Sequence, residues 1–472
     1  MKRALSLDVL RGLSIFGMVL SGTIPFGGAL PAWMYHAQCP PPTHAFNPAV
    51  AGITWVDLVL PVFIFCMGAA IPLALNRKIE KGANGIVLGK SIVARFFSLV
   101  FFAIYIAHIL PYVIGKGLVD LEVFGQQIAG YDLQWLTLVG FGLMFPMFGI
   151  IRDQHEKRIW RLAGWGGAVI LLLIFRWGYG QEFSLHRSNI IILLLANVYV
   201  LGALSWYFTR NNWLARSVLF IFWAAIQLTC KYTGFDQVID SFQGTSWFFL
   251  FRMTHYSLLI IPATFVGDLL LKRLQETPEK AQRKPAIVWE RLFHLGMGLL
   301  VVWLTVALFQ RWMIALLISL PLLLAGFWQI VKKHLPAYRS MFILAALLLL
   351  LGLLLEPVEG GIKKDHATAS YMVMTSGMAL CLLMFFDLVC RYWEQGGFVR
   401  LFAGAGSNPL MAYVVTTWFM FPFLKVTALI GVYNFLYPSG YPWFGALRAF
   451  ILVLATMGLV YWMAKKKIVW RA

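Results

Sequence analysis

Long apolar runs separated by short polar segments dominate this chain of 472 residues. A helix that crosses a lipid bilayer needs about twenty consecutive, mostly apolar residues. Runs of this kind cover residues 7–25, 52–75, 91–112, 132–151, 159–176, 188–208, 213–231, 247–271, 289–309, 312–331, 340–355, 369–390, 406–426 and 443–464. The pattern predicts an all-α fold, a polytopic transmembrane bundle of about fourteen helices that forms one integral membrane domain over residues 1–472.

The composition excludes a water-soluble globular protein. Hydrophobic residues make up 60% of the chain and charged residues only 12%, whereas soluble domains carry about 25% charged residues. A lipid bilayer is the expected solvent, because lipid accepts apolar side chains on the outside of a bundle. The five cysteines show no paired spacing, so we expect neither a disulfide nor a metal site.

The distribution of positive charge predicts the orientation. The formal net charge of +19 would suggest a nucleic-acid partner in a soluble protein. Here the lysines and arginines gather in alternate loops, and an excess of this kind marks cytoplasmic loops. The alternation holds from Lys2 and Arg3 to the cluster Lys465, Lys466 and Lys467. We therefore predict an even number of spans, both chain ends in the cytoplasm, and no nucleic-acid partner.

The first extracytoplasmic loop, residues 24–51, contains His36, His44 and Asn47. Asp57 follows about one turn into the next predicted helix, where the helix dipole favours a carboxylate. Histidine is the usual general base near neutral pH, and a nearby carboxylate can orient its ring. These residues are candidates for catalysis or substrate binding. The alternative is a compact loop whose polar side chains only satisfy backbone groups.

Two predicted helix starts on the cytoplasmic side could hold an anionic ligand. In the first, Asp8 and Arg11 lie three residues apart on one helix face, with Ser6 as the expected N-cap. In the second, Ser407 and Asn408 precede a proline, and the exposed amides of such a start attract phosphate. The alternatives are a structural ion pair and simple helix capping.

Three further polar residues lie in or beside later spans. Arg252 and His255 share a helix face near an extracytoplasmic end and could line a cavity, although an interhelical hydrogen bond is the commoner role. Lys364 precedes another span and could meet an anionic substrate group, or simply face water. Residue chemistry alone does not specify a reaction.

Several motifs stand out when they are taken together. They are Ser6-Leu-Asp8-Val-Leu-Arg11-Gly12, a His-Ala loop, Gly52-Ile-Thr-Trp-Val-Asp57-Leu-Val-Leu-Pro61-Val-Phe-Ile-Phe-Cys-Met-Gly68, the segment from Lys364 to Ser370-Tyr371, and Gly406-Ser-Asn408-Pro-Leu-Met-Ala-Tyr413. This combination resembles the heparan-alpha-glucosaminide N-acetyltransferase family, and most closely its bacterial membrane relatives. The resemblance is best over residues 1–75 and returns over about 360–425.

The resemblance implies a multi-pass protein of the bacterial inner membrane that passes an acetyl group from cytosolic acetyl-CoA to an amino sugar or glycan on the other side. It also implies a loop histidine as general base or acyl relay, oriented by Asp57. We favour His44 for this role over His36, because His44 needs the smaller insertion before Asp57. On the cytoplasmic side, the resemblance makes Asp8, Arg11, Ser407 and Asn408 candidates for the acetyl-CoA end.

Three functions follow as hypotheses. The first is the acyltransferase, with Asn47, Arg252 and His255 beside its sugar substrate. The second is an inner-membrane permease for an amino sugar or cell-wall sugar, which the number of helices and the polar pair Arg252 and His255 suggest. The third is a membrane scaffold without a ligand. Each is compatible with a homodimer.

Overall fold

The fold is an all-α polytopic bundle, seen in a computed structural model that describes residues 4–26, 30–115, 117–123, 125–150, 154–275, 287–437 and 440–470. The long helices are α1 (Leu5–Ser21), α2 (Trp55–Glu80), α3 (Gly85–His108), α5 (Tyr131–Phe148), α6 (Gln154–Tyr179), α7 (Ile190–Thr209), α8 (Trp213–Thr233), α11 (Ser257–Gln275), α12 (Ile287–Phe309), α13 (Met313–His334), α14 (Arg339–Leu355), α15 (Ala369–Tyr392) and α20 (Pro442–Lys465). A further composite helix joins α17 (Pro409–Val415), a π-helical turn (Thr416–Met420) and α18 (Phe421–Val426).

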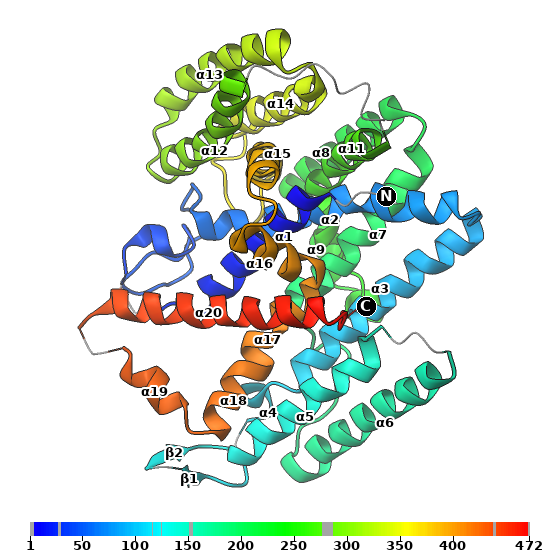
Figure 1. The fold of residues 1–472 in the computed structure, drawn as a ribbon, viewed down its shortest axis with the longest axis vertical. Helices are drawn as coiled ribbons and strands as arrows, with labels where there is room; N and C mark the ends of the chain where they lie inside the picture. The colour runs from blue at the N-terminus through cyan, green and yellow to red at the C-terminus, as the bar shows by residue number, and fades with distance from the viewer. Residues whose placement is uncertain are drawn as a thin grey trace.

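Shorter elements connect these helices. They are α4 (Pro111–Ile114), α9 (Phe235–Asp240), α10 (Gln243–Ser246), α16 (Gly397–Ser407) and α19 (Ile430–Phe435), the 3-10 turns η1 (Ala32–Met34), η2 (Phe251–Tyr256) and η4 (Pro336–Tyr338), and a hairpin of β1 (Leu121–Val123) with β2 (Gln126–Ile128). The hairpin is antiparallel and pairs Leu121 with Ile128. It lies at the lower edge of Figure 1, beside α4 and α5.

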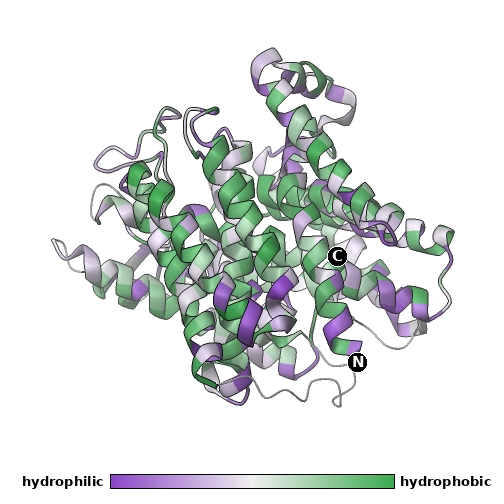
Figure 2. Ribbon diagram, turned by 90° about the horizontal axis from the view of Figure 1, so that it is seen from above, coloured by the Kyte–Doolittle hydropathy of each residue, from purple (hydrophilic) through white to green (hydrophobic). Residues whose placement is uncertain are grey.

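Every apolar run predicted as a span corresponds to a long helix. Within the described ranges, eleven helices are long and apolar enough to cross a membrane. The other three, α1, α5 and α11, are shorter or carry more polar residues. Figure 2 shows hydrophobic residues along much of the helices and hydrophilic ones in many connecting loops.

Close contacts between small residues hold the central helices together. A Cβ atom on Gly12 of α1 would lie 2.0 Å from the carbonyl oxygen of Phe402, and one on Gly406 would lie 1.9 Å from that of Asp8. The backbones of α1 and α16 therefore touch. A Cβ atom on Gly267 of α11 would similarly lie 2.5 Å from the carbonyl oxygen of Ala69 on α2. Membrane helices use small residues in this way, because packing rather than water exclusion holds them together.

Contacts between loops agree with the predicted alternation of sides. Both chain ends meet the start of α17, where Arg11 donates to the carbonyl of Gly406 and Asn408 donates to that of Ile468. Loops predicted on the other side meet each other, as in the bond from the amide of Asp365 to Gln38. The two ends of the chain thus share one face of the bundle. That this face is cytoplasmic stays a prediction.

Several basic loop residues that were used for this orientation lie outside the described part of the chain. They are Lys2, Arg3, Arg152, Lys280, Arg283, Lys284 and Arg471.

Candidate functional site

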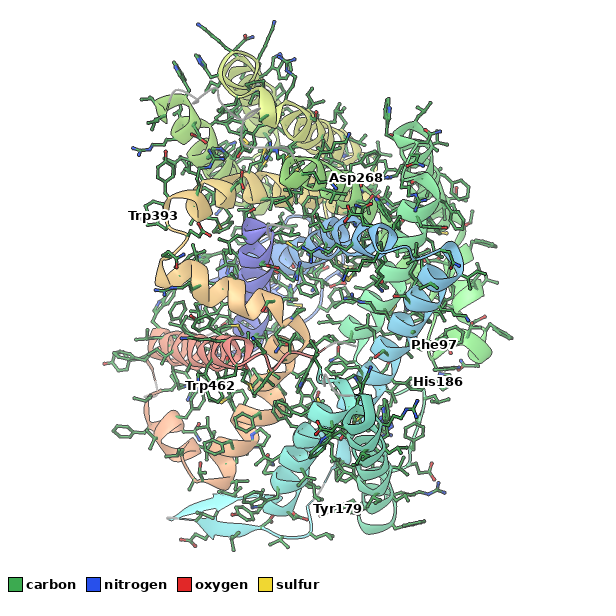
Figure 3. All side chains as sticks on the ribbon, turned by 45° about the vertical axis from the view of Figure 1, so that its right-hand side comes forward. Phe97, Tyr179, His186, Asp268, Trp393 and Trp462 are labelled. Atoms are coloured by element: carbon green, nitrogen blue, oxygen red, sulfur yellow. The ribbon has the colours of Figure 1, made fainter. Side chains whose placement is uncertain are left out.

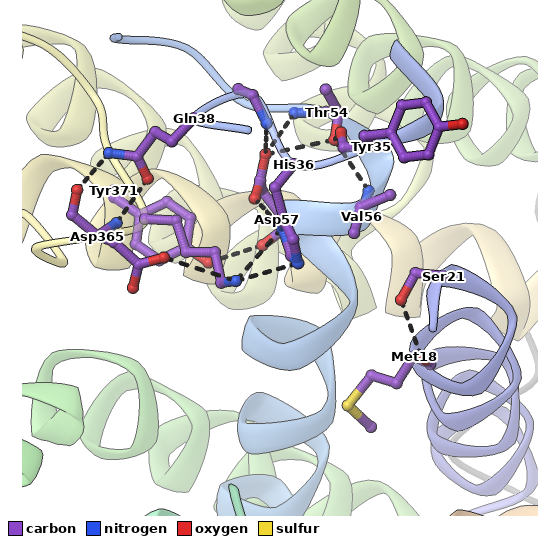
Figure 4. Close-up of polar contacts among 12 residues, drawn as sticks. Met18, Ser21, Tyr35, His36, Gln38, Thr54, Val56, Asp57, Asp365 and Tyr371 are labelled. Carbon is purple, nitrogen blue, oxygen red and sulfur yellow. Dashed lines mark hydrogen bonds and ion pairs between the residues drawn. The ribbon is translucent and has the colours of Figure 1, made fainter. Parts of the chain in front are cut away.

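Two loops that are far apart in the sequence meet above the start of α2. The amide of Gly52 donates to the carbonyl of Ile362 at 2.8 Å. The side-chain amide of Gln38 donates to the carbonyl of Asp365, whose own amide donates back to Gln38 at 2.8 Å. These paired bonds fix the loop before α2 against the loop before α15 (Figure 4).

Asp57 anchors the site because it completes a capping box at the start of α2. One carboxylate oxygen, Oδ2, accepts the amides of Thr54 at 3.0 Å and Ala37 at 3.1 Å. A capping box satisfies helix amides that would otherwise lack partners. The side chain is only 2% exposed. Asp57 is therefore a fixed, buried carboxylate that ties the loop to the helix.

The other carboxylate oxygen of Asp57 holds His36. Oδ1 lies 2.6 Å from Nδ1 of His36, whose side chain is 38% exposed. Because an ionised carboxylate only accepts hydrogen bonds, Nδ1 carries the hydrogen in this contact, and Nε2 of the neutral ring is left as an acceptor. A buried carboxylate thus fixes the ring while the ring itself reaches the surface.

Lys364 and Tyr371 complete the surroundings of this pair. Nζ of Lys364 lies 3.3 Å from both ring nitrogens of His36 and 3.8 Å from a carboxylate oxygen of Asp365. The buried hydroxyl of Tyr371 on α15 donates to the backbone carbonyl of Asp57 at 2.6 Å. The site therefore combines a histidine, a buried carboxylate and a lysine from opposite halves of the chain.

The prediction that His44 is the partner of Asp57 is wrong. The other candidate histidine, His36, occupies that position. Nδ1 of His44 lies 3.2 Å from the carbonyl oxygen of Cys39, and its ring packs on Tyr35 with centroids 4.4 Å apart. Asn47 is exposed, and its side chain accepts the amide of Ala49 within its own turn. Asn47 thus fits the alternative of a residue that satisfies local backbone.

Cys39 lies in the same loop but is poorly suited to nucleophilic chemistry. Burial raises the pKa of its thiol, although the neighbouring Lys364 lowers this pKa in part. The thiolate is the reactive form of cysteine, so a raised pKa makes the side chain less reactive. The histidine is the better candidate for chemistry here.

The candidates predicted on the cytoplasmic side lie close together, but they bind mainly one another and the C-terminal tail. Arg11 lies 3.5 Å from Asp8 and donates to the carbonyl of Gly406 at 2.9 Å. Asn408 is fully buried; it donates to the carbonyl of Ile468 and accepts the amide of Trp470. This geometry fits a structural clasp between the chain ends and does not fit an open phosphate site.

Two expected side-chain caps do not form, although Asn408 does occupy the N-cap position of α17. Ser6 lies inside α1, where its hydroxyl lies 3.4 Å from the carboxylate of Asp387 and makes no cap. Asn408 precedes Pro409 as expected, but its side chain binds the tail instead of capping α17. The hydroxyl of Ser407 donates to the carbonyl of Gly404 at 2.7 Å. Tertiary contacts thus engage the side chains of Ser6 and Asn408, whereas Ser407 bonds locally within α16.

Arg252 and His255 differ in exposure and in their contacts. Arg252 has a 62% exposed side chain, 3.7 Å from the carboxylate of Asp240. His255 is buried, with its ring centroid 6.1 Å from that of Phe251. The two side chains therefore lie in different surroundings.

Sequence reasoning missed the buried cation of the bundle. Arg216, near the start of the predicted span 213–231, is 1% exposed and lies 2.6 Å from Asp268 on α11. Thr209 and Thr264 accept its remaining donors, and Asp268, labelled in Figure 3, also accepts from Trp206. Arg216 is thus buried with three hydrogen-bonding partners, while the Asp268 side chain is 27% exposed, which fits a structural cluster.

The sequence of the first 270 residues matches a known family. The model of a family described as a domain of unknown function, DUF5009, matches residues 3–270. The chain belongs to this family. In this DUF5009 protein the matched segment contains His36, Asp57 and the clasp residue Arg11, whereas Lys364 and Tyr371 lie beyond it. None of the curated proteins compared with the chain matches it.

Proposed function

We propose that this protein is a membrane-embedded acyltransferase that passes an acyl group to an amino sugar or glycan at the extracytoplasmic face. The observation that carries the proposal is the 2.6 Å contact between the half-buried ring of His36 and the buried carboxylate of Asp57. A histidine oriented by a carboxylate is the arrangement that general base catalysis needs. The site lies on loops at one end of the spans, where a polar sugar can reach it from water.

In the proposed reaction, the amine nitrogen of the acceptor attacks the carbonyl carbon of the acyl donor. Nε2 of His36 takes the proton that the amine loses. The bond between the acyl carbon and the leaving group then breaks, and the imidazolium returns this proton to the leaving group. Asp57 accepts from Nδ1 throughout, so it keeps the ring in place and stabilises its charged form. A general base of this kind contributes about 10²–10⁴-fold to the rate.

Lys364 is the second functional group of the proposal. Its ammonium lies 3.3 Å from both nitrogens of His36, so it can reach an acyl group that is held at this ring. The carbonyl oxygen of that group gains negative charge when the amine attacks. A fixed positive charge stabilises such an oxygen, and this is often the largest single contribution to catalysis. We assign Lys364 this role.

The donor class rests on the family resemblance, which implies an acyl thioester such as acetyl-CoA from the cytosol. The residues assigned to its binding do not fit that role, because Arg11, Ser407 and Asn408 bind backbone carbonyls within the protein. We therefore derive no contact between these residues and the donor. Acetyl-CoA remains the first donor to test.

The proposal is tested with purified protein, radiolabelled acetyl-CoA and hexosamine acceptors. We expect wild-type protein to transfer label and His36→Gln to lower kcat by about 10²–10⁴-fold. His44→Gln is the matched control from the same loop and should change kcat only slightly. Lys364→Gln should lower kcat by about 10²-fold or more, whereas its neighbour Lys363→Gln should not.

The same preparation separates the enzyme from the permease. Wild-type protein is also reconstituted into proteoliposomes, and uptake of radiolabelled hexosamine is measured without a donor. Uptake without any transfer of label would reject the acyltransferase and favour the permease. Transfer that survives in His36→Gln but is lost in His44→Gln would reject the assignment of the base.

A further inference from the structure

A groove of about 530 Å³ lies between α12 and α13, and none of the residues that line it belongs to the His36 site. Its walls are mostly apolar, with Leu292 on α12 and Leu322 and Phe327 on α13. Its volume falls within the range of roughly 300–1,000 Å³ that is typical of small-molecule sites. The groove is therefore large enough to hold part of a ligand.

The groove opens at the surface of the bundle, where lipid is expected. The helices α12 and α13 lie at the upper edge of the bundle in Figure 1, on its periphery. Both are candidate membrane spans, and only 22% of the span on α13 is buried inside the protein. Leu322 is 67% exposed. A ligand in this groove would thus come from the bilayer, with its apolar part along these helices.

One end of the groove is polar and basic. Lys333 and His334, in the last turn of α13, line it there. Trp289 covers the same end, with its ring stacked on that of His334 at 5.1 Å between centroids. Tryptophan and lysine are typical of the membrane interface, where the lysine head group can extend toward water.

The charge at this end is not balanced by lining residues. Of the described residues that line the groove, none is acidic. Glu290, next to Trp289, is buried and contacts Arg391 instead. Lys333 is exposed and makes no hydrogen bond or ion pair to another described residue. A negative head group would complement this end, while its acyl chain would complement the apolar walls.

We propose that the α12–α13 groove binds an anionic phospholipid, with the phosphate at Lys333 and an acyl chain over Leu322 and Phe327. Basic pockets between membrane helices on the cytoplasmic side recognise anionic lipid head groups in this way. The predicted orientation places Lys333 on that side. Lys332 lies in the same last turn of α13 and interacts with the helix dipole as Lys333 does, but it does not line the groove. A substitution of Lys332 therefore controls for the loss of the dipole interaction.

Gly326 offers a substitution that should block the groove and leave the helix packing unchanged. Gly326 lines the groove, and a Cβ atom added to it would meet no other atom within 4 Å. Gly326→Leu should therefore fill the groove without disturbing the packing of α13. Gly166 on α6 is the matched control, because it is also exposed on a peripheral span and a Cβ atom added to it would likewise meet open space.

The test uses full-length protein in nanodiscs that contain either phosphatidylglycerol or phosphatidylcholine, each doped with a photoactivatable lipid of the same head group. We expect the anionic probe to crosslink to α12 and α13 and to exceed the zwitterionic probe. Gly326→Leu should abolish this crosslink. Lys333→Gln should lower it about fivefold, since one lysine near an anionic surface contributes about 1 kcal/mol.

Two control variants test whether the effect is specific to the groove. Lys332→Gln and Gly166→Leu should crosslink like the wild type, and unchanged thermal unfolding of all variants will show that they are folded. Equal crosslinking of both probes, or crosslinking that survives Gly326→Leu, would overturn the proposal. So would a crosslink between two copies of the chain through α12 and α13, which would assign the groove to a dimer interface.

Discussion

Replacing Asp57 with asparagine should separate its role in the helix cap from its effect on His36. The asparagine carbonyl is expected to face the backbone amides of Thr54 and Ala37, because these fixed donors need an acceptor. Its NH₂ group then points at Nδ1 of His36, where the carboxylate oxygen was. Nδ1 must now accept, so the hydrogen moves to Nε2. The ring keeps its place but has the wrong tautomer for a base.

The two effects have different magnitudes. Bonds to a charged acceptor contribute about 1.5–3 kcal/mol each, against about 0.5–1.5 for neutral ones, so two weakened bonds to Thr54 and Ala37 lower the free energy of unfolding by about 2 kcal/mol. In a His–Asp pair of the serine-protease type, the same substitution lowers kcat by about 10⁴-fold through the tautomer. We expect a transfer rate lowered by roughly 10³–10⁴-fold in Asp57→Asn.

Asp132 offers a matched control in the first turn of another span. Its carboxylate accepts the amides of Leu118 at 3.0 Å and Val119 at 3.3 Å, and it also accepts from a tyrosine hydroxyl. Asp132→Asn should therefore cost similar stability without slowing transfer. Thermal unfolding measures the first effect and the acetyl transfer assay the second.

Nitrogen NMR of labelled histidine reads the tautomer directly and does not depend on the proposed reaction. The resonances of His36 are assigned by their loss in His36→Gln. The hydrogen should lie on Nδ1 in the wild type and on Nε2 in Asp57→Asn. If Nδ1 keeps its hydrogen in Asp57→Asn, or if that variant transfers label at the wild-type rate, the assigned role of Asp57 is refuted.

Two further predictions concern stability and reactivity. Asp268→Leu leaves the buried Arg216 without its carboxylate and should lower the free energy of unfolding by about 3–5 kcal/mol, with partial recovery in the double variant Arg216→Met/Asp268→Leu. In the same thermal assay, Arg252→Met removes a 62% exposed side chain from Asp240 and should change this free energy by less than about 1 kcal/mol. Because burial raises the pKa of Cys39, maleimide should label it more slowly than a free cysteine at neutral pH. The labelling should become faster as the pH rises. Labelling at the rate of a free cysteine would contradict the burial seen here.

The helices could be predicted because the bilayer imposes a simple rule on the sequence. A span must be apolar over its whole length, so the apolar runs mark the helices directly. The largest shift of a boundary has a local cause. The run that starts at residue 247 forms α11 only from Ser257, since the segment before it folds as a 3-10 turn. There the carboxylate of Asp240 accepts the amides of Phe251 and Arg252.

The site was predicted in part. His36 and Asp57 were both candidates, but the distance along the chain favoured His44, which is closer to Asp57 in sequence. The loop reverses that order, because the amide of Ala37 binds Asp57 and brings its neighbour, His36, to the carboxylate. Sequence spacing cannot show this reversal, since it depends on which backbone amide meets a buried side chain.

The clasp at the chain ends shows the same limit. Ser407 and Asn408 have the residue types of a helix cap and of a phosphate site, and both ideas rest on local pattern alone. The tail that follows α20 supplies the carbonyl of Ile468 and the amide of Trp470 to Asn408. A contact between residues 60 positions apart has thus replaced the expected contact within one helix turn. No local motif can predict such a contact.

The division of the site between two parts of the chain limits what the DUF5009 segment can do alone. That segment, residues 3–270, supplies His36 and Asp57. The carbonyl of Asp57 accepts from the hydroxyl of Tyr371, and Nζ of Lys364 lies 3.3 Å from both ring nitrogens of His36; both residues come from the later part. Without that part, a buried carbonyl would lose its partner and the ring would lose its neighbouring charge. The chemistry proposed here therefore belongs to the whole bundle, since the loop before α15 is what closes the site over the start of α2.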